Sequence, residues 1–80
     1  MKEVVIKFKP FILNQAVFIR DEDGSITEEA VPQKSLAEYI SLIPNVNKIH
    51  FFGNKKFAEK IKNEFLTKYS NNTIEFLFNK

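Results

Sequence analysis

The sequence predicts a small α/β (α+β) domain, in which a mixed five-stranded sheet of element order β-β-β-α-β-α-β carries two helices on one face. Three segments with strand patterning occupy residues 2–31. Apolar residues then recur at helical spacing over residues 35–43 and 55–69. Each helical pattern leads into a further strand pattern, at residues 46–52 and 73–79. The two strands of such a strand–helix–strand unit run parallel, with a right-handed crossover.

The length of 80 residues limits the chain to one domain, residues 1–80. A core of this size rarely supplies more than about 3–5 kcal/mol of net stability, so small domains often add disulfides, a metal or oligomerisation. The chain has no cysteine and a single histidine, His50, which excludes disulfides and metal centres built from thiolates or several imidazoles. Packing of the nine Phe and two Tyr residues, or association with a partner, is left to stabilise the domain.

The first two strands are predicted from apolar runs. Val4–Lys9 begins as a continuous apolar run and ends in alternation, and Pro10 ends the strand because proline cannot donate to a ladder. After a turn at Asn14 and Gln15, the segment Ala16–Ile19 is apolar on both faces. A strand of this kind is expected inside a sheet that is covered on both sides.

The third strand follows the strongest turn signal of the chain, Asp21–Gly24, because Asp-Gly supplies the positive φ angles of a tight hairpin. Ser25–Val31 then returns as a short strand, with Ile26 as its main inward side chain. Glu28 and Glu29 suit an exposed edge, where charge discourages pairing with other chains.

Both helices have recognisable ends. Ser35 and Glu38 fit a capping box, in which each side chain satisfies a free backbone amide, and Pro44 ends the first helix. Gly53 turns the fourth strand into the second helix, and Asn71-Asn72 ends that helix. The predicted apolar stripes are Leu36, Tyr39, Ile40 and Ile43 on the first helix and Phe57, Ala58, Ile61, Phe65 and Tyr69 on the second, with Leu66 at the rim.

Three meandering strands followed by two crossovers resemble the ribonuclease H-like fold, whose strand order is 3-2-1-4-5. The resemblance rests on element order, spans essentially the whole chain and has no motif behind it; a small ferredoxin-like or other α+β sandwich is the main alternative. It implies carboxylates that hold divalent metal ions on the first strand, the first helix, the end of the fourth strand and the last helix. The corresponding strand segments, Val5–Phe8 and Phe51–Asn54, contain none, and only Glu38, Glu59 and Glu64 on the helices are available. The resemblance therefore implies a member without the nuclease site.

No other catalytic, cofactor-binding or metal-binding residues are predicted, so we do not expect an enzyme. His50 lies mid-strand among apolar residues and is expected to be packed or half-buried. Gly53 precedes a helix N-terminus and two lysines, where a phosphate can bind, but with only two glycines in the chain a simple turn is the favoured interpretation. The acidic turn Asp21–Asp23 lacks the other ligands of a calcium loop and is interpreted as a soluble hairpin tip.

Two helices cover one face of a five-stranded sheet and leave the other face open. If Val4, Ile6 and Phe8 point to the helices, then Val5, Lys7 and Lys9 point outward. The fourth strand contributes either His50 and Phe52 or Ile49 and Phe51 to this face. The predicted interaction face is therefore apolar, partly aromatic and edged with lysine, and consists of Val5, Lys7, Lys9, His50, Phe52 and Leu77. Exposed apolar patches of this kind usually mark an interaction site.

This face predicts a protein-interaction module that self-associates or docks onto a larger partner. The alternative is a nucleic-acid-binding module that stacks bases on aromatic residues and holds phosphates with lysines. The net charge of +2 and the near-absence of arginine weigh against the alternative. Abundant Lys, Asn, Ile and Phe suggest an A/T-rich genome. This composition, the small size and the missing active site together suit an accessory protein of a phage or mobile element. Without a signal sequence or a spanning run, we expect a cytoplasmic protein with no membrane contact.

Overall fold

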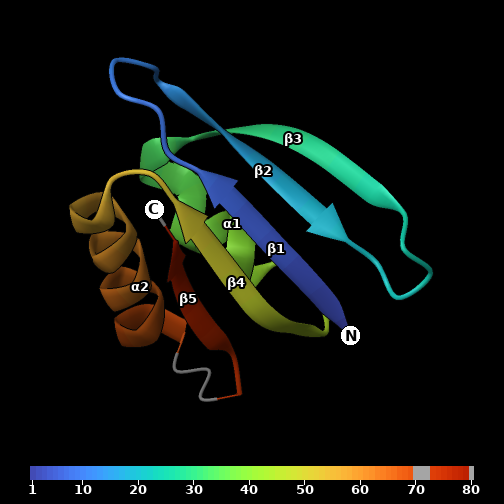
Figure 1. Cartoon of the computed structure of the whole chain (residues 1–80). Coiled ribbons are helices and arrows are strands. Elements are labelled where there is room, and N and C mark those ends of the chain that lie inside the picture. Colours follow the sequence, from blue (N-terminus) through green and yellow to red (C-terminus); the bar gives the residue numbers. More distant parts are fainter. Residues whose placement is uncertain (70–72, 80) are drawn as a thin grey trace.

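Five strands form one mixed sheet in the computed structural model of the chain, which describes residues 1–69 and 73–79 (Figure 1). The strands are β1 (Lys2–Lys7), β2 (Asn14–Arg20), β3 (Ile26–Pro32), β4 (Val46–Phe52) and β5 (Glu75–Asn79). Their order across the sheet is β3-β2-β1-β4-β5, which is the order that the resemblance implies. β1 is antiparallel to β2 and parallel to β4, so the predicted mixed sheet is confirmed.

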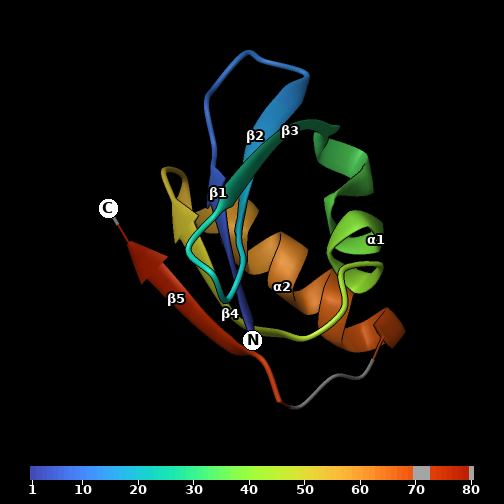
Figure 2. The ribbon, with the colours of Figure 1, turned by 90° about the vertical axis from the view of Figure 1, so that its right-hand side faces the viewer.

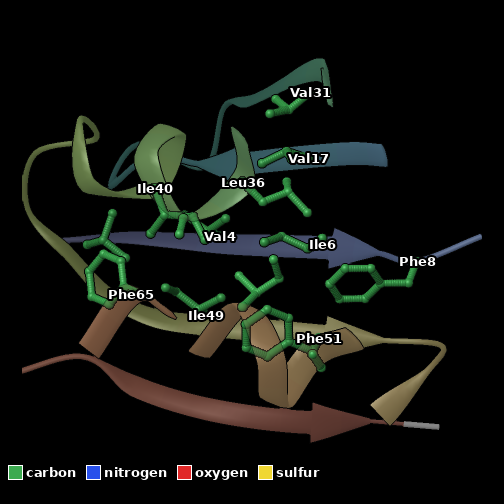
Figure 3. Close-up of a cluster of buried hydrophobic side chains, with 14 residues drawn as sticks. Val4, Ile6, Phe8, Val17, Val31, Leu36, Ile40, Ile49, Phe51 and Phe65 are labelled. Atoms are coloured by element: carbon green, nitrogen blue, oxygen red, sulfur yellow. The ribbon is translucent and has the colours of Figure 1, made fainter. Parts of the chain in front are cut away.

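The helical elements lie together on one face of the sheet (Figure 2). A short 3-10 turn (Gln33–Ser35) leads into α1 (Leu36–Ser41), and the longer α2 (Lys55–Tyr69) connects β4 to the last strand. Figure 3 shows the core between helices and sheet, with Val4 and Ile6 of β1 between the side chains of β2 and those of β4. The largest fully buried side chains are Phe51, Phe65, Ile6, Leu36, Ile40, Ile49, Val4 and Val17.

Alternation along the strands decides which side chains enter this core. On β1, Val4 and Ile6 are buried beneath the helices, whereas Val5 and Lys7 point to the other face. On β4 the alternation shifts once, because Lys2 and Glu3 pair with Val46 and Lys48 and leave Asn47 in a bulge. The bulge lets Val46 and Ile49 enter the core although they are three residues apart.

Two sequence predictions about the N-terminal strands are wrong. Ile26 is not an inward side chain: it pairs with Arg20 on the open face, and 65% of its surface is exposed. Val31 instead provides the buried contact of β3, because the hairpin register places it on the helix face. β2 does lie inside the sheet, but only its Val17 face is covered, and Phe18 lies on the uncovered side.

The helix boundaries agree with the sequence better than the caps do. The capping box is absent, since Ser35 makes no side-chain cap hydrogen bond. The reason is the preceding 3-10 turn, in which the Leu36 amide donates to the Gln33 carbonyl. At α2 the cap is Asn54, whose Oδ1 accepts from the amides of Lys56 and Phe57. The predicted end of this helix at residues 71–72 lies outside the described residues.

Both glycines have backbone conformations that favour glycine. Gly24, with φ of +88°, closes the β2–β3 turn, as predicted from the Asp-Gly signal. Gly53 has φ of +102°, and a Cβ there would lie 2.5 Å from the Phe8 carbonyl oxygen. The β4–α2 connection therefore depends on close backbone approach as well as on a turn.

Candidate functional site

The open face of the sheet consists of three rows of side chains that run across the five strands. The central row is Glu28, Phe18, Val5, His50 and Leu77. The row toward the β1–β2 loop is Ala30, Ala16, Lys7, Phe52 and Asn79. The row toward the β2–β3 turn is Ile26, Arg20, Glu3, Lys48 and Glu75. Neither helix covers these rows, because both helices lie on the opposite face (Figure 2).

Five of the six residues predicted for this face lie on it together. They are Val5, Lys7, His50, Phe52 and Leu77. The choice left open by the sequence is resolved in favour of His50 and Phe52, since Ile49 and Phe51 are buried under the helices. The sixth residue, Lys9, lies beyond the end of β1 at the margin of the face.

Phe18 is a central residue of this face that the sequence did not single out. It lies directly opposite Val5 in the β1–β2 pairing and is half-buried. Lys7 Nζ lies 5.2 Å from the centre of its ring, a distance at which a cation is attracted to an aromatic face. Side chains alternate along a strand, so a buried Val17 places its neighbour Phe18 on the open face. The sequence signal for Phe18 was therefore this alternation.

Charged residues occupy the row nearest the β2–β3 turn. His50 Nε2 donates to Glu3 Oε1 over 3.1 Å, and Arg20 Nη1 lies 4.0 Å from the other carboxylate oxygen. The hydrogen bond from His50 is the main reason that the pKa of Glu3 is lowered from its ordinary 4.5, and the charges of His50, Lys48 and Arg20 contribute. Mixed charge therefore borders Val5 and Phe18 of the central row on this side.

The β1–β2 loop presents a second apolar surface that the sequence analysis missed. Phe11 is fully exposed, with φ of +62°, and Leu13 is 88% exposed. Gln15, the one buried polar side chain among the described residues, holds this loop. Its Oε1 accepts from the Lys9 amide, and its Nε2 donates to the carbonyls of Lys9 and Ile12. The sequence signal for this second surface was the run of four apolar residues, 10–13, that follows the first strand.

The loop adjoins the open face rather than standing apart from it. A hollow of about 380 Å³ lies between them. It is lined by Lys9, Ile12, Asn14, Ala16, Glu28, Glu29 and Ala30. Ile12 and Ala16 thus join the two apolar surfaces into one region.

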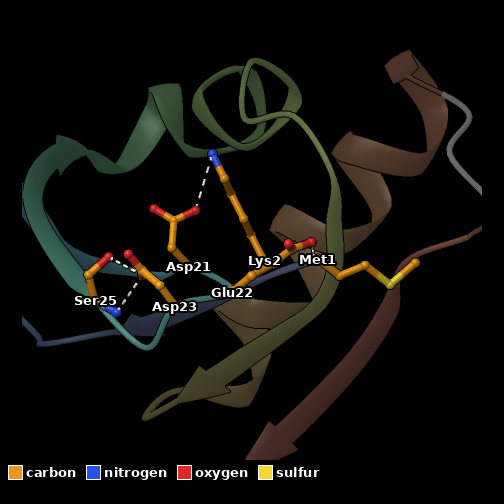
Figure 4. Close-up of polar contacts among 6 residues, drawn as sticks. All are labelled: Met1, Lys2, Asp21, Glu22, Asp23 and Ser25. Carbon is orange, nitrogen blue, oxygen red and sulfur yellow. Dashed lines mark hydrogen bonds and ion pairs between the residues drawn. The ribbon is translucent and has the colours of Figure 1, made fainter.

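The carboxylates of the acidic β2–β3 turn form contacts within the chain (Figure 4). Its three carboxylates have separate partners: Asp21 pairs with Lys2 Nζ at 3.7 Å, and Glu22 with the N-terminal amine of Met1. Asp23 accepts from the hydroxyl of Ser25 at 2.6 Å and from its amide at 2.9 Å, and these bonds lower the pKa of Asp23. The carboxylates do not converge on one point, which a bound cation requires.

The start of α2 offers little to a phosphate. Asn54 already occupies the amides of Lys56 and Phe57 with its side chain. Its backbone carbonyl also accepts from Ala58 at 3.1 Å. Gly53 is explained by its close approach to Phe8, in agreement with the turn interpretation.

The helix carboxylates named by the resemblance are spread over the surface. Glu59 pairs with Lys55 at 4.0 Å and Glu64 with Lys68 at 3.4 Å, both along α2. Among residues 1–69 and 73–79, no three His, Asp or Glu side chains gather as a metal site does. In the same part of the chain, no helix is long and apolar enough to span a membrane.

Comparison with protein-family models, curated proteins and solved structures gives no match to this chain.

Proposed function

We propose that this chain is a non-enzymatic protein-interaction module that binds its partner through the open face. The observation that carries the proposal is the central row of that face, where Phe18 and Val5 lie side by side and Leu77 follows beyond His50, on the side that neither helix covers. Apolar side chains in such a row lose water when a partner packs against them, which favours association. The fold is proposed to be a ribonuclease H-like one, on its strand order, without the nuclease site.

The charges of the face favour protein over nucleic acid as the partner. Three basic side chains, Lys7, Arg20 and Lys48, share it with three carboxylates. The carboxylates are Glu3, Glu28 and Glu75. A surface without net charge gains little from counterion release, which supplies most of the affinity for a phosphate backbone. An apolar centre with a mixed polar border is instead the usual anatomy of a protein interface.

Nucleic-acid binding is the second candidate, because Lys7 lies against the ring of Phe18 and is directly opposite Phe52 on β4. An aromatic ring beside a cation is the pairing with which sheet platforms stack bases and hold phosphates. Fluorescence anisotropy with short single- and double-stranded DNA and RNA at low salt separates the candidates. Saturable, salt-sensitive binding that Lys7→Glu abolishes would replace the first proposal by the second.

The direct test places a photo-crosslinking phenylalanine analogue at position 52 and, as a matched control, at position 42. Leu42 is 74% exposed but belongs to the helical side of the molecule. We expect the probe at position 52 to crosslink a defined partner protein, and the probe at position 42 to give none. Val5→Asp, next to position 52 on the face, should abolish that crosslink while the circular dichroism spectrum stays unchanged. Equal crosslinking from both positions, or crosslinks insensitive to Val5→Asp, would refute the proposal.

A further inference from the structure

The two edges of the sheet differ in how they are protected against pairing with another chain. The β3 edge carries Glu28 and Glu29 in its middle and ends in Pro32, and charges and proline are the devices by which natural proteins blunt an edge. The β5 edge has neither: Phe76, Leu77 and Phe78 follow one another, and Glu75 at one end is its single charged residue. Among the described residues only β4 pairs with β5, so one side of its backbone is open.

The side chains of β5 are also only partly covered. On the helix face, Phe76 and Phe78 stack on Phe51 with ring centres 6.1 Å and 5.5 Å apart. Lys62 Nζ caps both rings from α2, at 5.4 Å and 5.5 Å from their centres. Phe78 is nevertheless 37% exposed, and a hollow of about 180 Å³ lies between it and the start of α2. This edge therefore combines an open ladder with aromatic surface that a neighbouring strand would cover.

We propose that β5 pairs antiparallel with β5 of a second copy of this chain, about a two-fold axis at Leu77, and joins two sheets into one. In this register Leu77 faces Leu77 of the second copy, and Phe76 faces its Phe78. Glu75 faces Asn79, so no like charges oppose one another and the strand is complementary to itself. Directly opposed aromatic and apolar pairs are the units that stabilise antiparallel sheets.

A two-fold contact of this kind closes after two copies, since it uses the one edge of the sheet, as described for residues 1–69 and 73–79, that has no charge or proline in its middle. The register also keeps matching faces together, because directly opposed residues of antiparallel strands point to the same side. The open faces of both copies would thus form one continuous surface, with the helices of both on the other side. Pairing at this edge involves the strand backbone and does not depend on the open face binding a partner.

Single-cysteine variants test the register directly, because the chain has no cysteine of its own. Only a residue on the two-fold axis meets its own copy, so Leu77→Cys should form a disulfide-linked dimer under mild oxidation. Opposed Cβ atoms in such a pair lie about 4.5–5.5 Å apart, near the distance of about 3.5–4.5 Å in a disulfide. Ile26→Cys, 65% exposed on the β3 edge, is the matched control and should stay reduced. Equal crosslinking of both variants would overturn the proposal.

Sedimentation equilibrium of the wild-type chain provides the second arm. We expect a reversible monomer–dimer equilibrium, and Phe78→Lys should weaken the dimer at least tenfold by placing a cation in the paired strand. Ile26→Lys puts the same charge on the other edge and should leave the dimer unchanged. A wild-type chain that stays monomeric up to millimolar concentration would overturn the proposal. Val5→Asp distinguishes the β5 contact from partner binding at the open face. If this substitution abolishes the crosslink from position 52 but leaves the Leu77→Cys dimer intact, the two surfaces act independently.

Discussion

On β1, Val4 and Ile6 are completely buried beneath the helices, whereas Val5 and Lys7, each one residue further along, lie on the face that neither α1 nor α2 covers. The same alternation separates Phe51 from Phe52 on β4 and Val17 from Phe18 on β2. Residues of nearly the same chemistry thus have different environments because of parity alone. Apolar side chains on the helix face stabilise the fold, while those on the open face remain available to a partner.

Polar groups show the same contrast. On the helix face, Gln15 is 2% exposed and its side-chain amide bonds the backbone of the β1–β2 loop. On the open face, His50 keeps 24% of its side chain exposed and bonds Glu3, its neighbour across the strands. A polar side chain that is buried without hydrogen-bond partners destabilises the fold. Gln15 can be buried because the loop backbone supplies its partners. The two faces therefore differ in what a substitution should change, stability on one and binding on the other.

The largest expected effect contrasts adjacent phenylalanines. Phe51→Ala removes a buried ring that stacks against Phe8, Phe76 and Phe78 and should lower the free energy of unfolding by about 3–5 kcal/mol. Phe52→Ala, on the open face, should cost no more than about 1 kcal/mol. Urea unfolding followed by circular dichroism measures both.

A domain this small tolerates little loss of stability. If Phe51→Ala does not fold, Phe51→Leu leaves a smaller cavity and keeps the comparison measurable. Equal losses for the substitutions at positions 51 and 52 would mean that the two faces are covered alike.

The next effect concerns the buried amide. Gln15→Leu keeps most of the side-chain volume but leaves the amide and carbonyl of Lys9 and the carbonyl of Ile12 without this partner. We expect a loss of about 1–3 kcal/mol in the free energy of unfolding, with faster hydrogen exchange at the Lys9 amide. Asn14→Ala, an exposed position on the same strand, is the control and should change stability by less than about 0.5 kcal/mol. Unchanged exchange at Lys9 would show that the loop does not depend on Gln15.

The sequence predicted which side chains share a face of the sheet wherever a strand alternates around side chains that are clearly apolar. The run from Val4 to Phe8 alternates around a buried face, so Val5 and Lys7 follow, and parallel pairing then carries His50 and Leu77 with them. The placement of Val5, Lys7, His50, Phe52 and Leu77 on one face is confirmed for this reason, whereas Lys9 lies at its margin and the role of the face in binding stays a prediction. The helix stripes have an equally clear period, and Leu36, Ile40, Ala58, Ile61 and Phe65 are buried as expected, whereas Phe57 and Tyr69 near the two ends of the second helix are exposed.

The errors arose where contacts with a neighbouring segment, rather than the pattern of the residues themselves, decided the local structure. Ile26 is apolar, but the hairpin register pairs it with Arg20 and turns it outward. The capping box at Ser35 fits the sequence, yet a 3-10 turn already satisfies the Leu36 amide. The loop at Phe11–Leu13 contradicts the expectation that connections are polar, and it is held by Gln15, which the sequence suggested only as a turn residue.

The smallest expected effect tests the polar border of the open face through its pH dependence. The hydrogen bond from His50 lowers the pKa of Glu3 in the folded chain below its value in the unfolded chain. A group of this kind contributes stability that is complete above its unfolded pKa, about 4.3 for glutamate, and is lost as the pH falls through its folded pKa. Glu3→Gln removes this contribution, so it should slightly lower stability near neutral pH, leave stability at acid pH little changed and make the acid limb of the stability curve shallower. Urea midpoints between pH 3 and 7 measure this, with Glu28→Gln on the same face as the control that keeps the His50 bond. An acid limb as steep as that of the wild type would show that His50 and Glu3 do not interact in solution, and the border would then be ordinary solvated charge.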